Sequence, residues 1–225
     1  MQQMNTLHKL NFFSQTYVWL TERLYNELAW AYDPFSWIVS GGKWTAWRNE
    51  VLTQIIGKQV LELGFGTGEL LIALHRCGLA VYGLEQSQAM HKVTARKLQQ
   101  QGILGIPRVC GLAQHLPYPS NYFDTVVATF PSGYVFDPNT LSEVKRVLRS
   151  PNADGSVTGG RFVIVGLYAD YLGKTLGWIS KEHLLDENKR GRWAPGWDVR
   201  IIKPTQAKLT LPIVIFEKLN ERHEQ

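Results

Sequence analysis

Residues 60–71 read VLELGFGTGELL, and this stretch decides how the chain folds. A short apolar run enters a turn with glycines at 64, 66 and 68, and residues 69–75 then have the composition of a helix. An apolar run that ends in a glycine turn is typical of a buried parallel strand. Glycine lets the backbone turn sharply and approach a ligand, and the following helix would direct free N–H groups at it. The stretch therefore predicts a ligand loop at the carboxyl end of a first strand.

The spacing of this loop does not fit the two common phosphate-binding motifs. A dinucleotide fingerprint requires Gly-x-Gly-x-x-Gly, and a phosphate loop requires Gly-Lys-Ser/Thr. Here Glu69 follows Gly68 directly, and the loop contains no lysine. Glu62 stands two residues before the first glycine, where a carboxylate would repel a pyrophosphate and attract an ammonium group.

The pattern Glu-x-Gly-x-Gly-x-Gly over residues 62–68 resembles motif I of the class I S-adenosylmethionine (SAM) methyltransferases. In that family the ligand has a methionine amine and carboxylate in place of phosphates. Segments 111–127 and 141–149 resemble the family's motif II and a later helix, so the resemblance covers about residues 58–168. It implies SAM as the cofactor, S-adenosylhomocysteine (SAH) as the product, and no metal.

Beyond residue 60 the chain alternates between strand-like and helix-like segments, which favours a parallel sheet with helices on both faces. Strands are expected over 60–63, 80–84, 108–110, 125–130, 161–167, 199–203 and 209–219, and helices over 87–101 and 139–149. Pro212 indicates that the last strand is an edge strand or contains a bulge. The expected fold is α/β: a doubly wound, mostly parallel seven-stranded sheet, a class I methyltransferase-like Rossmann fold with an N-terminal helical cap.

Residues 1–58 are expected to form this cap, and residues 59–225 the SAM-binding domain as one structural unit. Five of the eight tryptophans lie in the first segment, and a helix is expected over 44–56. Aromatic side chains at helical spacing are more often packing than binding, so a helical layer on the core is the default interpretation. The alternative is a lid over an apolar substrate.

Glu85 ends the second expected strand, 17 residues after Gly68. A carboxylate at that place can accept both hydroxyls of a ribose in charge-assisted hydrogen bonds. In the resembled family this acid holds the SAM ribose, and Met90 matches the family's apolar contact under the adenine. The expected cofactor contacts are Glu62, Gly64, Phe65, Gly66, Gly68, Glu85, Gln86, Met90, Ala113, Gln114 and Thr129.

Motif II departs from the family pattern at one position. The family usually places an aspartate after the motif's glycine, where it accepts from the adenine amine, and this chain has Leu112 there. The backbone of Ala113 and the amide of Gln114 are the expected substitutes. Asp124 is expected to position the fourth strand.

The methyl acceptor is expected to be a small, largely apolar molecule, quinone-like or lipid-like. Residues 31–48 resemble the leader of ubiquinone/menaquinone C-methyltransferases, although the family's Phe-Gly-Leu-Arg-Asn after the fourth strand is replaced by residues 129–134. The expected acceptor contacts are Tyr32, Trp37, Tyr134 and Tyr168. Tyr134 is also the only candidate for a general base, and the catalytic residues stay unassigned.

Length and composition limit the class of protein and its location. The chain has 225 residues, 44% hydrophobic and 19% charged, which suits one globular domain with elaborations. It has no apolar run of the ~18 residues that cross a bilayer, no signal-peptide pattern, and two cysteines without metal spacing. These features favour a cytoplasmic protein, and they leave peripheral membrane contact open. They do not determine the oligomeric state.

The net charge of +5 is modest, and it disfavours nucleic acid as the main partner. One basic cluster nevertheless keeps an RNA methyltransferase open as an alternative. It comprises Lys189, Arg190, Arg192, Arg200 and Lys203. A catalytically silent interaction protein with a SAM-binding fold is a further alternative.

Overall fold

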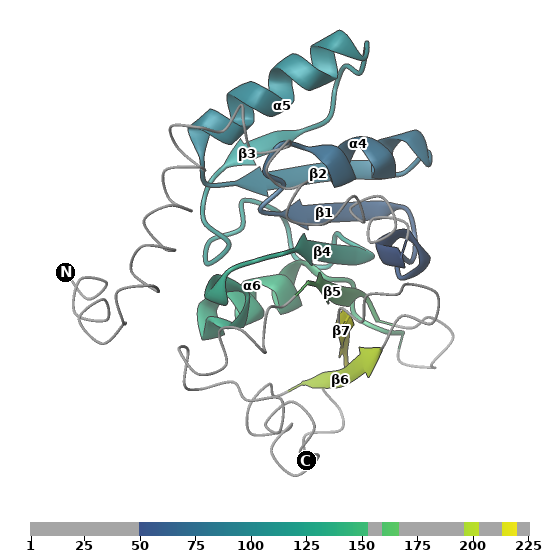
Figure 1. The fold of residues 1–225 in the computed structure, drawn as a ribbon. Helices are drawn as coiled ribbons and strands as arrows, with labels where there is room; N and C mark the ends of the chain where they lie inside the picture. The colour runs from purple at the N-terminus through teal and green to yellow at the C-terminus, as the bar shows by residue number, and fades with distance from the viewer. Residues whose placement is uncertain (1–49, 153–158, 167–195, 203–212, 220–225) are drawn as a thin grey trace, which may run out of the picture.

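The computed structural model describes residues 50–152, 159–166, 196–202 and 213–219, and these form one layered α/β unit (Figure 1). Residues 50–53 are helical. The further elements are β1 (Gln59–Leu63), α4 (Glu69–Arg76), β2 (Ala80–Glu85), α5 (Gln88–Gln100), β3 (Arg108–Cys110), β4 (Thr125–Thr129), η4 (Gly133–Phe136), α6 (Pro138–Val147), β5 (Arg161–Val165), β6 (Trp197–Ile202) and β7 (Ile213–Lys218).

The described strands form a seven-stranded sheet in the order β3-β2-β1-β4-β5-β7-β6. All pairs from β3 to β5 are parallel, and β7 runs antiparallel to both of its neighbours. The strand order reverses at β1, whose two neighbours are β2 and β4. This is the topological switch point of a doubly wound sheet, where ligands bind beyond the carboxyl ends of the strands. The predicted α/β fold is confirmed.

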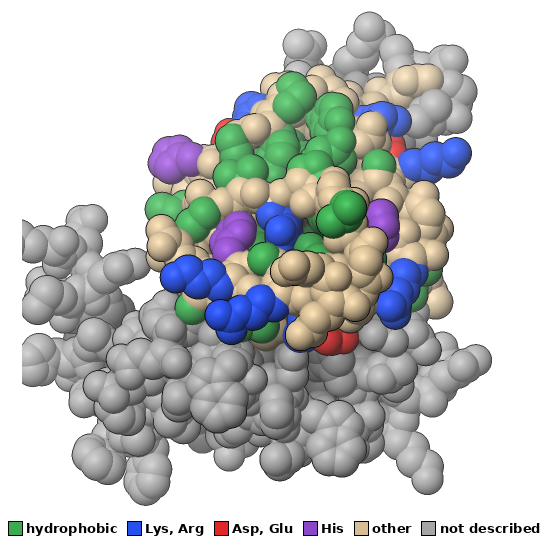
Figure 2. All heavy atoms as spheres, turned by 90° about the horizontal axis from the view of Figure 1, so that it is seen from above, with side chains coloured by type: hydrophobic (Ala, Val, Ile, Leu, Met, Phe, Trp, Pro, Cys, Tyr) green, Lys and Arg blue, Asp and Glu red, His purple; other side chains and the backbone are tan. Residues whose placement is uncertain are grey.

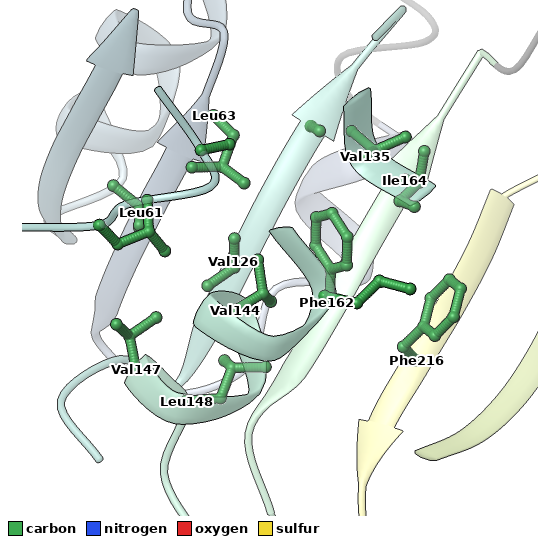
Figure 3. Close-up of a cluster of buried hydrophobic side chains, with 14 of the residues drawn as sticks. Leu61, Leu63, Val126, Val135, Val144, Val147, Leu148, Phe162, Ile164 and Phe216 are labelled. Carbon is green, nitrogen blue, oxygen red and sulfur yellow. The ribbon is translucent and has the colours of Figure 1, made fainter. Parts of the chain in front are cut away.

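Apolar side chains fill both faces of the sheet. Leu61 and Leu63 point to one face, where they form one cluster with Phe162 of β5, Phe216 of β7 and apolar side chains of α6 (Figure 3). Val60 points to the other face, and it belongs to a second cluster that includes the apolar residues of α4 and Leu98 of α5. Alternate residues of the same strand therefore lie in different layers, as the pleat of a β-strand requires.

The helix starts follow local capping signals. The Ser87 side chain accepts a hydrogen bond from Met90 N at the start of α5. Asp137 accepts from the N–H groups of Asn139 and Thr140 at the start of α6, whose first residue is proline. Serine and aspartate are preferred N-caps because their oxygens satisfy N–H groups that lack helical partners, and proline is favoured directly after the cap.

Two of the predicted element assignments were wrong. β7 was expected to be an edge strand or to carry a bulge, but it pairs with β5 and β6 in unbroken register. The observed strand spans Ile213–Lys218, and Pro212 lies outside the described residues. The helix expected to reach Ile56 ends at residue 53. The backbone N–H of Ile56 instead donates to Thr125 Oγ1 at 3.0 Å.

The expected boundary between the cap and the SAM-binding domain lies at residue 58, and the described residues just before it already pack on the sheet. Val51 is buried in the cluster under α4, and Leu52 and Ile55 pack against it. Residues 1–49 lie outside the described residues, so the cap over 1–58 stays a prediction. No helix of the described part is long and apolar enough to cross a bilayer.

Asp124 joins three segments at the amino ends of the strands, opposite the switch point. Its Oδ2 accepts from Lys58 N and Gln59 N at 2.8 and 2.9 Å, and its Oδ1 pairs with Arg149 Nη1 at 2.8 Å. The carboxylate thus fixes where β1 starts relative to β4, the structural role predicted for it.

We expect Asp124→Ala to lower the free energy of unfolding by about 2–3 kcal/mol, because two backbone N–H groups lose a charged acceptor. Chemical denaturation measures this. Asp198→Ala on β6 is the matched control, because Asp198 is more exposed and lies 3.9 Å from Arg200; it should cost under ~0.5 kcal/mol. Equal losses in the two variants would show that the Asp124 contacts do not stabilise the fold.

Candidate functional site

The glycine loop after β1 has left-handed backbone conformations that favour glycine. Gly64 has a φ of +68°, and a Cβ on it would lie 2.8 Å from Tyr134 Oη. Its N–H donates to Leu84 O at 2.7 Å, which ties the loop to the end of β2. Gly68 N then donates to Phe65 O at 2.8 Å and closes the turn before α4. The predicted ligand loop is thus a tight, fixed turn at the switch point.

Gly66 is the centre of this loop, and hydrogen bonds fix it on both sides. Its N–H donates to Glu85 Oε2 at 3.0 Å, and its carbonyl accepts from Thr94 Oγ1 at 2.8 Å. A Cβ added to Gly66 would meet no atom of the described residues within 4 Å. The loop is therefore held from β2 and α5 while the space beside Gly66 stays open for a ligand.

Glu62 is a buried carboxylate with an unused oxygen. Glu62 is 1% exposed, and its Oε2 has no hydrogen-bond partner among the residues that the structure describes. Burial, and secondly the nearby Glu85, raise the pKa of Glu62 well above its ordinary value. A buried acceptor without a donor is costly, so the position suits a ligand that supplies a positively charged donor.

Glu85 lies at the carboxyl end of β2, and it is also buried. Besides Gly66 N it accepts from Ser87 N, through Oε1 at 2.8 Å. Each carboxylate oxygen has two lone pairs, so each can accept one further hydrogen bond. The side chain can therefore hold the loop and still accept from a ligand with two adjacent hydroxyls.

Tyr134 brings an aromatic side chain from η4 to the same place. Its Oη donates to Leu63 O at 3.3 Å, directly before the glycine loop. Burial raises the pKa of Tyr134, and the charges of Glu85 and Glu62 raise it further. A phenol with a raised pKa keeps its proton at neutral pH, and here Tyr134 donates that proton in a hydrogen bond to Leu63 O.

The other expected cofactor contacts lie around the carboxyl ends of the strands, with different exposure. The side chains of Phe65 and Met90 are buried, and the Phe65 ring packs edge-on against His91 at a centroid distance of 4.8 Å. Only the backbone of Phe65 is therefore available to a ligand. Gln86 is exposed, Ala113 is buried, and Gln114 and Thr129 are partly buried. The expected acceptor contacts Tyr32, Trp37 and Tyr168 lie outside the described residues.

A polar hollow of about 440 Å³ adjoins this edge. It lies between the segment after β3 and helix α6. Its lining residues are Gln114, His115, Leu116, Pro117, Asn139, Ser142 and Glu143. Among the described residues, no group of three His, Cys, Asp or Glu side chains could hold a metal ion.

Two residues near the site were missed at the sequence level. Thr94 is fully buried, and its hydroxyl donates to the Gly66 carbonyl. The sequence does contain a signal for this role, because Thr94 is a polar residue four positions from both Met90 and Leu98 on the buried face of α5. Phe130 follows β4 with a φ of +49°, a strained conformation for a bulky residue. No sequence signal marks that conformation.

A family model described as "Methyltransferase domain" matches residues 60–151. The demethylmenaquinone methyltransferase of Symbiobacterium thermophilum is 31% identical over 149 residues, which are 62% of this chain and 56% of that protein. The phosphatidylethanolamine N-methyltransferase of Cereibacter sphaeroides is 33% identical over 139 residues, 55% of this chain and 64% of that protein. The chain thus spans less than two thirds of either relative.

The fold is also that of solved methyltransferases. The geranyl diphosphate C-methyltransferase of Streptomyces coelicolor, solved with S-adenosyl-L-homocysteine, aligns with a TM-score of 0.57 over 78% of this chain and 79% of that one. The two sequences are 13% identical, so this likeness concerns the fold alone.

The buried charge of Glu62 predicts an unusual effect of its removal. Glu62→Gln should raise the free energy of unfolding of the unliganded protein near neutral pH by roughly 1–2 kcal/mol, because no charge is then buried. A carboxyl group with a raised folded-state pKa favours folding below its ordinary value of 4.5, and this contribution is lost as the pH rises through the raised value. The stabilising effect of Glu62→Gln should therefore disappear below about pH 4.5.

Urea unfolding near neutral pH and below about pH 4.5 measures this effect. Glu69→Gln is the control, because the Glu69 side chain is 37% exposed and pairs with Lys97 at 2.8 Å. It removes the same charge and should not stabilise the protein. An equal or lower stability of Glu62→Gln near neutral pH would contradict the interpretation.

Proposed function

We propose that this chain, whose residues 60–151 are a methyltransferase domain and whose fold is that of the class I SAM-dependent methyltransferases, transfers the methyl group of SAM to a small, largely apolar acceptor. The observation that carries the proposal is the Oε2 of Glu62, which is buried beside a glycine loop at the switch point and has no partner in the described part of the chain. A buried carboxylate oxygen of this kind favours a positively charged hydrogen-bond donor, and the methionine part of SAM has an ammonium group.

The residues at the carboxyl ends of β1, β2 and β3 fit SAM from one end to the other. Glu62 would receive the ammonium group, and the open space beside Gly66 gives the ligand room along the loop. Glu85 would accept the two ribose hydroxyls through its remaining lone pairs. The backbone of Ala113 and the amide of Gln114 would contact the adenine, since Leu112 has no polar group to do so.

SAM supplies a methyl group that its sulfonium already activates, so the chain's own task is to bind, orient and exclude water. Holding two reactants at near-attack distance can supply ~7–11 kcal/mol of a barrier. Tyr134 and Leu63 fix the position of the loop that would carry the methyl donor. In this proposal Tyr134 donates to Leu63 O, and an acceptor that must lose a proton would need another group as its base.

The relatives support an apolar acceptor. Their names refer to demethylmenaquinone and phosphatidylethanolamine, and both names belong to small molecules with long apolar parts. We therefore propose a quinone-like or lipid-like acceptor here. Residues 1–58, with Tyr32 and Trp37, are proposed to cover it, together with Tyr168. A cover of this kind excludes water and fixes the approach of the methyl group.

No observation favours the RNA alternative over this one. Of the basic cluster, only Arg200 lies among residues whose side chains the structure describes, and its guanidinium pairs with Glu217. On the α5 side of the molecule, Lys and Arg side chains are scattered and not gathered into one stripe (Figure 2). Incubation with methyl-labelled SAM and separate lipid, small-molecule and RNA fractions of a lysate tests the acceptor class. Label in the RNA fraction alone would reject a small apolar acceptor, and no label in any fraction would favour a silent interaction protein.

The ligand prediction is that the protein binds SAM and SAH but not NAD. Glu62 would attract the ammonium group of SAM and repel a pyrophosphate, and the loop has no lysine for phosphates. Titration calorimetry with the three ligands is the measurement. Tight binding of NAD with none of SAM or SAH would reject the proposed function.

Glu85→Gln should weaken SAH binding by roughly 2–4 kcal/mol, because the ribose would lose a charged acceptor. The variant should also melt earlier, since Gly66 and Ser87 share that carboxylate. Binding is therefore measured well below the melting temperature. Asp198→Asn removes the same charge on β6 and should bind SAH normally. Unchanged affinity in Glu85→Gln would show that Glu85 serves only the loop.

A further inference from the structure

The segment from Gly111 to Ser120, between β3 and β4, contains neither helix nor strand. It carries Ala113 and Gln114, the proposed contacts of the adenine. Near its start, Gly111 N donates to Glu85 O at 3.2 Å, and His115 N donates to Leu112 O at 3.1 Å. Residues 117 and 119 are prolines, which have no N–H to donate. The second half of the segment therefore depends on partners from elsewhere in the chain.

Two side chains of α6 supply these partners. Glu143 Oε2 accepts from Leu116 N at 2.7 Å, and Arg146 Nη2 donates to Leu116 O at 2.9 Å. Arg146 Nη1 donates to Tyr118 O at 2.8 Å. Both backbone groups of Leu116 are thus bound by one helix, and its side chain is buried in the core below.

The two side chains also orient each other. Arg146 Nε donates to Glu143 Oε1 at 2.7 Å, and Nη2 donates to Glu143 Oε2 at 2.9 Å. The paired geometry holds the planar guanidinium in one orientation, in which its remaining N–H groups face the segment. A partly exposed ion pair contributes little stability by itself, so the contacts with the segment are the main consequence of this pair.

The segment depends on the contacts with Glu143 and Arg146 because a polar hollow lies beside it. Gln114 and His115 face Asn139 and Ser142 of α6 across it, so the packing of side chains does not fix the segment on that side. Without Glu143 and Arg146, the segment could shift into the hollow and move Gln114.

We infer that Glu143 and Arg146 are positioning residues for the adenine end of the cofactor site: they clamp residues 116–118 onto α6 and so fix Ala113 and Gln114. The inference rests on the proposed function, because it takes SAM as the ligand. It adds a role for α6, which contributes none of the proposed cofactor contacts.

The first test compares Arg146→Ala with Lys145→Ala. Both remove one positive charge from α6, and Lys145 forms no ion pair with another side chain in the described part of the chain. SAH affinity is measured by calorimetry at a temperature where circular dichroism shows both variants folded. Arg146→Ala should bind SAH about tenfold more weakly than the wild type, because the charge-assisted hydrogen bonds to the carbonyls of Leu116 and Tyr118 are lost, and Lys145→Ala should bind it normally. Equal affinity in Arg146→Ala and the wild type would overturn the inference.

The second test exchanges the charges in the double variant Glu143→Arg, Arg146→Glu. This variant keeps an ion pair at the same spacing. However, an arginine at position 143 cannot accept from Leu116 N, and a glutamate at position 146 cannot donate to the carbonyls of the segment. We expect SAH affinity to stay as low as in Arg146→Ala, because the contacts with the segment are not restored. Recovery of SAH affinity would show that only the ion pair matters and would overturn the inference. Failure of the wild type to bind SAH would instead reject the proposed function.

Discussion

The carboxylate of Glu85 is the interaction on which the site depends. It accepts from Gly66 N and Ser87 N, so it joins the loop after β1, the end of β2 and the start of α5. It lies close enough to Glu62 to raise the pKa of that side chain. Two buried carboxylates near each other are costly without a cation, and this cost is consistent with a site shaped for a positively charged ligand.

Helix α6 and the turn before it contact both ends of the carboxyl edge. At one end, Tyr134 of η4 reaches Leu63 O. At the other end, Arg146 of α6 reaches the carbonyls of Leu116 and Tyr118. Asp137 N donates to Tyr134 O at 3.1 Å and connects η4 to α6. The apolar face of α6 packs on β4 and β5 (Figure 3), so η4 and α6 together connect the proposed methyl-donor end to the proposed adenine end.

Most of the fold could be predicted because its signals are local. The β3 prediction, 108–110, matches the observed strand, and the helix predicted over 87–101 is α5 with its cap Ser87. The errors occurred where partners far away in the sequence decide. Pro212 suggested an edge strand, but β7 is central because β6 adds to its far side. The helix predicted to reach Ile56 ends early, where Thr125 binds the chain instead.

The sequence by itself determined the strand and helix pattern, the glycine loop and the acidic residues that flank it, because these depend on spacing within a few turns of chain. Only the tertiary structure decided that Glu62 Oε2 has no partner within the described ranges and that Tyr134 donates across 71 residues to Leu63. It also decided that Arg146 holds Leu116 and that Phe130 adopts a positive φ. Such contacts arise when separate strands and helices are packed together, and no local pattern encodes which polar group will meet which.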